Sequence, residues 1–195
     1  MKNKLLKPEE DIANEVFENE DFSNSTISSK NIDKIVFNNC DFTNVKFDTC
    51  ILDGITFNNC DLSMVEFVDG GIHRCKFKNT KLVGANIGKS SMRNVIVEEC
   101  YAKYFNLYQT RTSRLFLKSS NFTEARFYDC VLAEAIFDSV NFLSAEFLNT
   151  SLSGVDLSET EISGLRIKEE DIKGAIISIK QTPLVATLFG LKIKD

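Results

Sequence analysis

The sequence predicts an all-β solenoid in which the chain turns a corner every five residues. Three observations lead to this fold class. An apolar residue stands at every fifth position, a column of small or apolar residues precedes it by two positions, and turn-forming residues fill the rest. A period of five suits neither a helix nor a strand with alternating side chains. It suits a coil that sends one large and one small residue of each unit inward.

The column of large residues begins at Ile12 and ends at Ile177. It has 34 members, of which only Thr112 is polar, and it contains 13 of the 16 Phe residues. A chain that is 43% hydrophobic does not reach this order by chance. We therefore expect one solenoid over residues 12–177, a lead-in or cap at 1–11, and a C-terminal helix with an extended tail at 178–195.

The small column carries no charge in its 25 members from Ile35 to Val155. Charged residues return only toward its ends, where we expect the solenoid to be capped or frayed: Glu10, Glu15, Glu20, Lys30 and Glu170. The other positions are rich in Asn, Asp, Ser, Thr and Gly, which favour turns.

Units such as CDFTN (40–44), CDLSM (60–64), SNFTE (120–124) and VDLSE (155–159) carry a resemblance to the pentapeptide-repeat family, whose consensus is A(D/N)LXX. The resemblance implies a right-handed quadrilateral β-helix of about eight coils, with four units in each coil. Residues 20 apart then share a face. The faces of Phe37, Phe42 and Phe47 should carry Phe ladders, and the face of Ile32 should contain no Phe.

The six cysteines all fall in the small column and contain no C-x-x-C pair, at positions 40, 50, 60, 75, 100 and 130. We interpret them as buried small hydrophobic residues rather than metal ligands. Cys40 and Cys60 are expected to stack one coil apart and to stay reduced, as in a cytosolic protein.

The sequence does not predict an enzyme. His73 is the sole histidine and is expected on a surface corner, with no nucleophile motif or phosphate-binding loop nearby. A filled solenoid also offers no cavity for a small-molecule substrate. We therefore expect no catalytic residue, no cofactor and no metal.

Composition also limits the partners and the location. The net charge of −5 and the pI near 5.1 argue against direct nucleic-acid binding. A charged N-terminus without an apolar segment and the lack of a long apolar run argue against secretion and membrane insertion. We expect a cytoplasmic protein.

An acidic column is the first candidate interaction surface. Asp21, Asp41 and Asp61 recur at 20-residue spacing, with Glu161 on the same face. They form either an acidic stripe that imitates phosphates or a simple preference of the repeat for Asp at a turn.

The segment 89–118 is the second candidate, because the repeat is least regular there. Its inward positions shrink at Val97, Ala102 and Thr112, and Phe105 takes a normally small site. Tyr and Arg are frequent in interface hot spots, and the candidate contact residues are Tyr101, Tyr104, Tyr108, Arg111, Arg114 and, one coil beyond, Tyr128. The alternative is an irregular coil with compensating surface residues.

The C-terminus leaves the five-residue period. Thr182 is predicted as a helix N-cap, Pro183 as the first helical residue and Gly190 as the stop. So short a helix needs a surface to pack on. Its apolar residues either cap the last coil or join two rods as a dimer: Leu184, Val185, Leu188 and Phe189, followed by Leu191 and Ile193.

The ending Leu188-Phe189-Gly190-Leu191-Lys192-Ile193 resembles that of the Qnr, MfpA and McbG group of pentapeptide-repeat proteins. The resemblance implies a C-terminal homodimer that imitates DNA and binds type II topoisomerases, DNA gyrase above all, and that protects them from quinolones or toxins. The unbroken period is similar to that of the members without loop insertions. A cytosolic interaction scaffold with another partner is the alternative.

Overall fold

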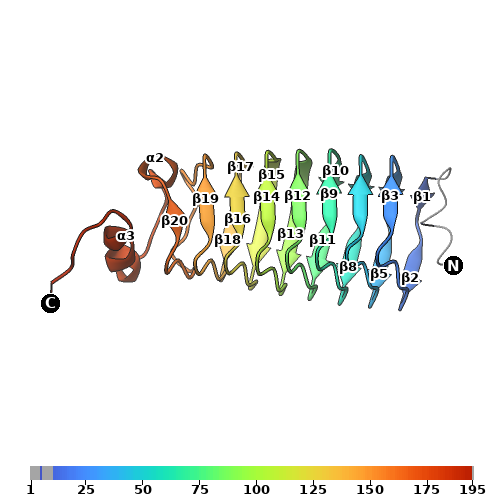
Figure 1. Ribbon diagram of the computed structural model, residues 1–195, viewed down its shortest axis with the longest axis horizontal. Coiled ribbons are helices and arrows are strands. Elements are labelled where there is room, and N and C mark those ends of the chain that lie inside the picture. Colours follow the sequence, from blue (N-terminus) through green and yellow to red (C-terminus); the bar gives the residue numbers. More distant parts are fainter. Residues whose placement is uncertain (1–4, 6–10, 195) are drawn as a thin grey trace.

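The computed structural model describes residue 5 and residues 11–194, which form a single rod of stacked coils with the chain termini at opposite ends (Figure 1). All strands pair in parallel with partners 20 residues away, as in Phe17↔Phe37 and Phe47↔Phe67. Because each coil hydrogen-bonds to the next, the backbone is satisfied along the whole ladder. The predicted β-solenoid of about eight coils is confirmed.

We number the four faces of the rod by the order in which the chain reaches them. Face 1 contains β1 (Ile12–Ala13), β4 (Asn31–Asp33), β7 (Ile51–Asp53), β10 (Gly71–His73) and β17 (Val131–Ala133). Face 2 contains β2 (Val16–Glu18), β5 (Val36–Asn38), β8 (Thr56–Asn58), β11 (Lys76–Lys78) and β18 (Ile136–Asp138). The longer strands β13 (Ser91–Glu98) and β15 (Arg111–Lys118) cross both faces and join them into one 12-stranded sheet.

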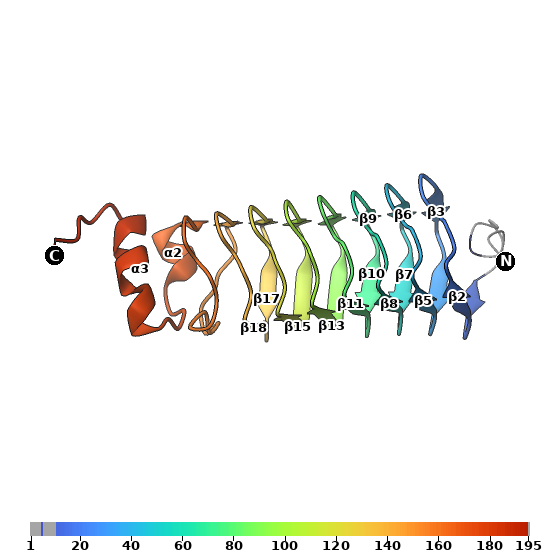
Figure 2. The same ribbon diagram turned by 90° about the horizontal axis from the view of Figure 1, so that it is seen from below.

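Face 4 is a separate sheet of eight short strands (Figures 1 and 2). These are β3 (Thr26–Ser28), β6 (Lys46–Asp48), β9 (Glu66–Val68), β12 (Asn86–Gly88), β14 (Asn106–Tyr108), β16 (Arg126–Tyr128), β19 (Glu146–Leu148) and β20 (Arg166–Ile167). Face 3 pairs through isolated parallel bridges, which run from Asp21 to Glu161 in the described chain.

Each corner is made by a residue with a left-handed backbone. Positive φ values recur every five residues at 26 non-glycine positions, nine of which are Asn. Asn tolerates this conformation better than most residues, so the turn chemistry of the repeat agrees with the corners.

The core of the first coils is a set of aromatic ladders. On face 2, the ring centroids of Phe17, Phe37, Phe57 and Phe77 follow one another at 5.3, 5.2 and 5.1 Å. Phe22 and Phe42 stack on face 3 at 4.8 Å, and Phe47 and Phe67 on face 4 at 4.7 Å. The predicted ladders are therefore present on three faces, and the core of face 1 has no Phe.

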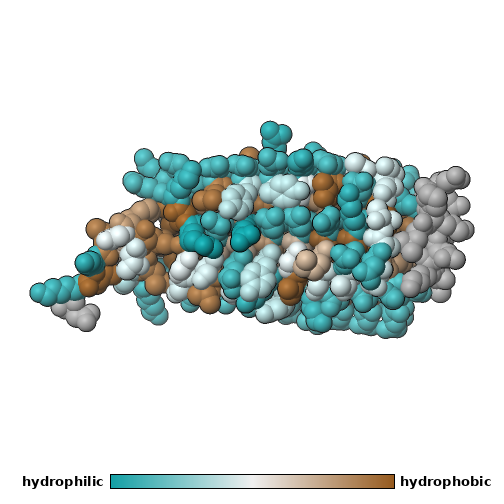
Figure 3. Space-filling model, in the orientation of Figure 1, coloured by the Kyte–Doolittle hydropathy of each residue, from teal (hydrophilic) through white to brown (hydrophobic). Residues whose placement is uncertain are grey.

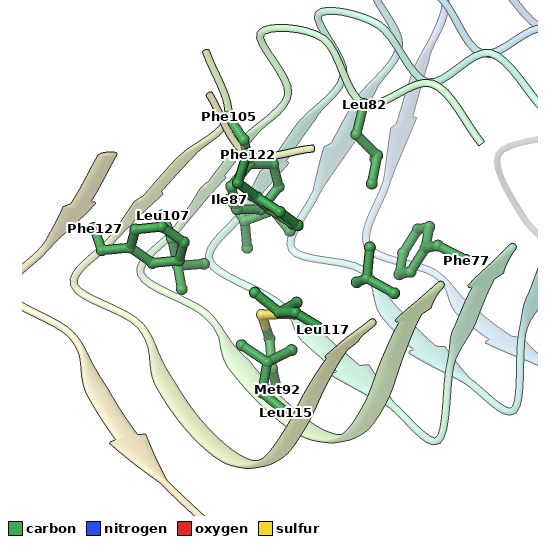
Figure 4. A pocket seen from close by; sticks show the side chains of 11 residues that line it. Phe77, Leu82, Ile87, Met92, Phe105, Leu107, Leu115, Leu117, Phe122 and Phe127 are labelled. Carbon is green, nitrogen blue, oxygen red and sulfur yellow. The ribbon is translucent and has the colours of Figure 1, made fainter. Parts of the chain in front are cut away.

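The ladders break in the middle coils, as the sequence predicts. Aliphatic side chains replace Phe at Val97 and Leu117, and Phe105 turns inward from the small column to meet Phe122 edge to face. The change leaves an apolar cavity of about 20 Å³ inside the rod (Figure 4). All its lining side chains are apolar, so a water molecule there would lack hydrogen-bond partners.

The last coil departs from the predicted pattern. The short helix α2 (Glu169–Ile172) replaces a strand, so Ile172 is half-buried instead of lying in the core column. Asp171 is buried and its side chain accepts a hydrogen bond from the backbone N–H of Asn149. Glu170 would fall at an inward position of the small column, and its charge is better solvated on an exposed helical turn than in an apolar core.

The C-terminal helix forms where expected, but its cap differs. The 3₁₀ turn η1 (Ile179–Gln181) runs into α3 (Thr182–Leu188), so Thr182 is already helical and the predicted N-cap role is wrong. Ser178 and Gln181 form a capping box instead. The buried Gln181 amide also donates to the carbonyls of Leu157 and Thr160, both at 2.8 Å, and so closes the last coil.

The N-terminal end is closed in a related way. Leu5 is fully buried, and the buried Lys30 ammonium donates a hydrogen bond to its carbonyl oxygen at 2.9 Å. A charge in the small column thus serves the cap. The rest of the predicted lead-in before Asp11, including Glu10, lies outside the described residues.

Candidate interaction surfaces

The acidic column is built of turn-forming side chains. Asp21, Asp41 and Asp61 stack through successive bridges on face 3. Each carboxylate accepts a hydrogen bond from the backbone N–H two residues later, at 2.9, 2.8 and 3.0 Å. Burial alone would raise the pKa of Asp61, but hydrogen bonds from Ser63 and the Lys81 cation lower it overall. The turn role explains the spacing, and the second carboxylate oxygen of Asp61 accepts a hydrogen bond from the Lys81 ammonium at 3.0 Å.

Beyond its three aspartates, the column contains basic, aromatic and amide residues as well as an acidic one. Above Asp61 it passes through Lys81 and Tyr101, and then through Asn121 and Asn141 to Glu161. The side chains of Asn121 and Asn141 accept the same turn hydrogen bond as the aspartates. The negative charge of the column is therefore not required by the fold.

The Tyr/Arg segment does not form one patch, because it wraps around the rod. Tyr101 and Tyr104 are exposed at face 3, where the Lys103 ammonium lies 4.6 Å from the ring centroid of Tyr104. Tyr108 and Tyr128 are half-buried neighbours on face 4, and the Tyr128 hydroxyl donates to Glu146 at 3.2 Å. The predicted stacking of these two residues is confirmed.

The arginines of that segment belong to face 1. Arg111 begins the face 1 part of β15, and Arg114 lies at the corner where β15 passes to face 2. The in-register neighbours of this region are small: Ser91 pairs with Arg111, and Ser113 with Arg93.

His73 lies on the same face, at the end of β10 rather than at the corner, which is occupied by Arg74. Its ring is half-buried, and its Nε2 hydrogen-bonds with the Ser91 hydroxyl at 3.0 Å. The expected corner position of His73 is therefore wrong, because the left-handed corner residue is Arg74. The His73 side chain folds back over Gly71.

The cysteines lie in the core. All six are buried and unbridged, as the small column predicts. Burial raises the pKa of the Cys75 thiol to about 12 and that of Cys100 to about 11. A hydrogen bond with Cys40, together with burial, raises the pKa of Cys60. The same hydrogen bond lowers the pKa of Cys40. Cys60, Cys75 and Cys100 therefore stay protonated at neutral pH, which makes them poor nucleophiles and poor metal ligands.

The six apolar C-terminal candidates separate into two groups. Leu184, Val185 and Leu188 pack against the core and cover the last coil. Phe189, Leu191 and Ile193 are exposed, and so is Ile179 before the helix, at 92%. Apolar atoms accordingly gather at this end of the surface (Figure 3).

The net charge of the protein changes sign from one segment of the rod to the next along its length. Residues 11–70 contain 12 Asp and Glu against three Lys and Arg, a formal net charge of −9. Residues 71–130 contain 11 Lys and Arg against four Asp and Glu, a net charge of +7. Residues 131–177 contain nine acidic against three basic residues, a net charge of −6. We call these segments the first, middle and last thirds.

Two surface features were not predicted from the sequence. Ile96, Phe116 and Ile136 form an exposed apolar row in register across face 2. A groove of about 550 Å³ runs along the corner between faces 4 and 1 of the middle third. In the sequence, the apolar row and the groove correspond to apolar or small residues that recur 20 residues apart at outward positions. The repeat usually has polar side chains at these positions.

The chain is similar to a known family and to several solved structures. The family of Pentapeptide repeats matches residues 106–164 with eight copies. The full-length structure of QnrB1, a plasmid-mediated fluoroquinolone resistance protein, is similar with 18% identity and a TM-score of 0.48, over 92% of this chain and 99% of that one. HetL, involved in heterocyst differentiation regulation in the cyanobacterium Nostoc sp., has 14% identity and a TM-score of 0.40, over 85% of this chain and 90% of HetL. No curated protein sequence matches the chain significantly.

A parallel solenoid that turns a left-handed corner every five residues and repeats its register every 20 defines the class of protein. The family match identifies pentapeptide repeats over residues 106–164, and the same five-residue corners and 20-residue register continue on both sides of that segment.

Proposed function

We propose that the protein is a non-enzymatic binding protein that recognises a macromolecule with the outer surface of its rod. The sorting of charge into thirds carries this proposal, because a filled core leaves the surface as the variable part of the molecule. In the described chain, no group of three or more His, Cys, Asp or Glu side chains is placed to hold a metal ion, and no helix is long and apolar enough to cross a membrane.

The more specific candidate partner is a type II topoisomerase, DNA gyrase or topoisomerase IV. The resemblance of the C-terminal tail to the quinolone-resistance group motivates it, and the acidic first third supports it. Duplex DNA is a dense row of negative charges, and the first third offers 12 carboxylates over about three coils. The positive middle third restricts any imitation of DNA to the acidic thirds.

A supercoiling assay with gyrase, with and without a quinolone, tests this candidate. We expect micromolar protein to inhibit the enzyme or to protect it. The triple variant Asp21→Asn, Asp41→Asn and Asp61→Asn should lose most of the effect while keeping its fold, because Asn121 and Asn141 make the same turn in the same column. Asp156→Asn is the matched control, since Asp156 makes the same turn outside the first third.

No inhibition and no protection by the wild-type protein would refute topoisomerase binding. An interaction scaffold with another partner would then be the better account of the same fold. An undiminished effect of the triple variant would instead exclude the acidic column as the contact surface.

The proposal includes a homodimer through the C-terminal end. Exposed Phe189, Leu191 and Ile193 support it, because an apolar cluster of this kind is characteristic of an interaction site. Phe189→Asp combined with Ile193→Asp should give a monomer in sedimentation, without disturbing the residues that cap the last coil. Ile136→Asp, which alters an equally exposed apolar residue on face 2, should leave the mass unchanged. A double variant with the wild-type mass would refute this dimer.

A further inference from the structure

Two cations of the middle third, Lys89 and Arg111, line a groove on the rod together with Asp69 and Asp129. The groove runs along the corner between faces 4 and 1 and has a volume of about 550 Å³. The other lining residues are uncharged, and they are Gly70, Ser90, Ser91, Gln109 and Val131. The Tyr108 ring lies beside it, over Gly88, a position that has no room for a Cβ atom.

Cations continue from the groove across face 1. Arg93 follows on β13, and Arg114 lies at the next corner. The side chains cross the rod in the direction of the strands, from the Lys89 corner to the Arg114 corner. One face is five residues wide, which is about 16 Å of extended chain.

These cations are available for a ligand. Lys89, Arg93, Arg111 and Arg114 are exposed, and none of them forms an ion pair with a described residue. Several other cations of the middle third are paired, among them Arg74 with Asp53, Lys76 with Glu98, and Lys103 with Glu124, whereas Lys78 and Lys118 on face 2 are also without an ion pair to a described residue.

A preference of the turns for particular residues does not explain the positions of two of these four cations. Lys89 and Arg114 occupy left-handed corners with φ of 49° and 58°, where Asn or Gly is intrinsically favoured. Asp and Asn in the face 3 column make turn hydrogen bonds, whereas these two long side chains make none in the described chain.

We propose that this groove and the adjoining part of face 1 bind an extended acidic segment of a partner protein, about five residues long. The segment would lie along the strands of face 1, with its carboxylates toward Lys89, Arg111, Arg93 and Arg114. The proposal goes beyond the proposed function, because it uses the positive middle third and not the acidic first third or the C-terminal end.

The surroundings favour an acidic peptide over duplex DNA. The four cations lie on two neighbouring coils, and in the corner column of Lys89 the acidic residues Asp69 and Asp129 lie one coil before and two coils after it. Two coils span about 10 Å, the width of one extended strand with its side chains. A duplex crossing here would bring further phosphates within a screening length of the acidic first and last thirds.

The test measures binding of a fluorescein-labelled decaglutamate peptide to the full-length protein by anisotropy at low salt. We expect the wild type to bind and the affinity to fall as salt is added. The double variant Lys89→Asn and Arg114→Asn should bind about tenfold more weakly, since it removes two unpaired surface cations. Asn suits both corners, so the variant should remain folded by circular dichroism.

Lys34→Asn is the matched control. Lys34 lies in the same corner column as Arg114, with φ of 50°, but in the first third, where it pairs with Asp33 at 2.8 Å. Its removal should leave peptide binding unchanged. Equal binding by the double variant and the wild type, or no binding by the wild type at millimolar peptide, would overturn the proposal.

Two further outcomes would reassign the surface. Tighter binding of a labelled DNA duplex than of the peptide, lost in the double variant, would mean a nucleic-acid site and overturn the acidic-peptide assignment. Self-association in sedimentation that disappears in the double variant would mean that the acidic third of a second copy fills the groove, and would overturn it equally.

Discussion

The first and middle thirds have the same backbone fold, but they differ in the residues that fill the core and in the charge of the surface. In the first third, stacked Phe rings fill the core and the surface is acidic. In the middle third, aliphatic side chains replace most of the ladder rings, a small cavity opens and the surface is basic. Strand pairing continues without a register shift through both, from Phe57↔Phe77 to Val97↔Leu117.

The difference teaches that coil-to-coil hydrogen bonds maintain the register, while side chains adjust how tightly each third is packed. Backbone N–H groups donate to the neighbouring coil in both thirds, as Asn39 and Gln109 do at 2.9 and 2.8 Å. Nearest-neighbour interfaces then add up along a solenoid. A weaker interface in the middle third is tolerated because better-packed coils lie on both sides.

Core truncation should reveal this difference most strongly. Phe57 is fully buried and stacked between Phe37 and Phe77, so Phe57→Ala should cost about 4 kcal/mol of unfolding free energy. Leu117 borders the existing cavity and already lacks contacts on one side, so Leu117→Ala should cost about 2 kcal/mol. Urea denaturation followed by circular dichroism measures both. Equal losses would mean that the middle third is packed as tightly as the first.

Removal of one buried hydroxyl in the middle third should give the next largest effect, and it should raise the stability of the protein instead of lowering it. Thr112 is the one polar residue of the core column, and its Oγ1 is buried without a hydrogen-bond partner in the described chain. Thr112→Val should therefore stabilise the protein by about 1 kcal/mol. Thermal denaturation would show the increase.

Thr80 supplies the matched control for this substitution. It is equally buried, but its hydroxyl donates to the carbonyls of Phe57 and Lys78, at 3.3 and 3.0 Å. Thr80→Val should thus destabilise by about 1 kcal/mol. If both variants lose stability, the Thr112 hydroxyl has a partner that stabilises it.

The sequence predicts most of the fold because one period determines which residues lie inside. The inward positions, the stacked Tyr108 and Tyr128, and the buried cysteines all follow from spacing alone. The ends were harder to predict, because capping depends on single tertiary contacts. Gln181 reaches back to the carbonyls of Leu157 and Thr160, and no local pattern indicates such a contact.

The candidate surfaces were predicted in part. Spacing identified the acidic column and the Tyr/Arg segment, but it did not separate Tyr104 on face 3 from Arg111 on face 1. Nor did it indicate that Leu188 caps the rod while Ile193 is exposed, since both are apolar residues after the repeat. Which side of a short helix faces the core depends on how the preceding turn, η1, directs the chain.

The smallest expected effect is a shift in the pKa of His73, which lies on face 1 of the middle third. Burial of the ring, and after it the Arg93 cation, lower the pKa of His73, with a smaller opposite contribution from Asp53. Because His73 is the sole histidine, its ring resonances in an NMR titration report this pKa without overlap. We expect a value below the ordinary pKa of about 6.5.

The Arg93→Gln variant separates the two causes. Removing the cation should raise the pKa of His73 only part of the way, because burial is the larger cause. Since the folded pKa lies below the unfolded one, the unfolded state takes up the proton first as the pH falls. His73 therefore contributes a loss of stability that begins near pH 6.5 and is complete below the folded pKa. A wild-type pKa at or above 6.5 would contradict the positive potential that we assign to face 1 of the middle third.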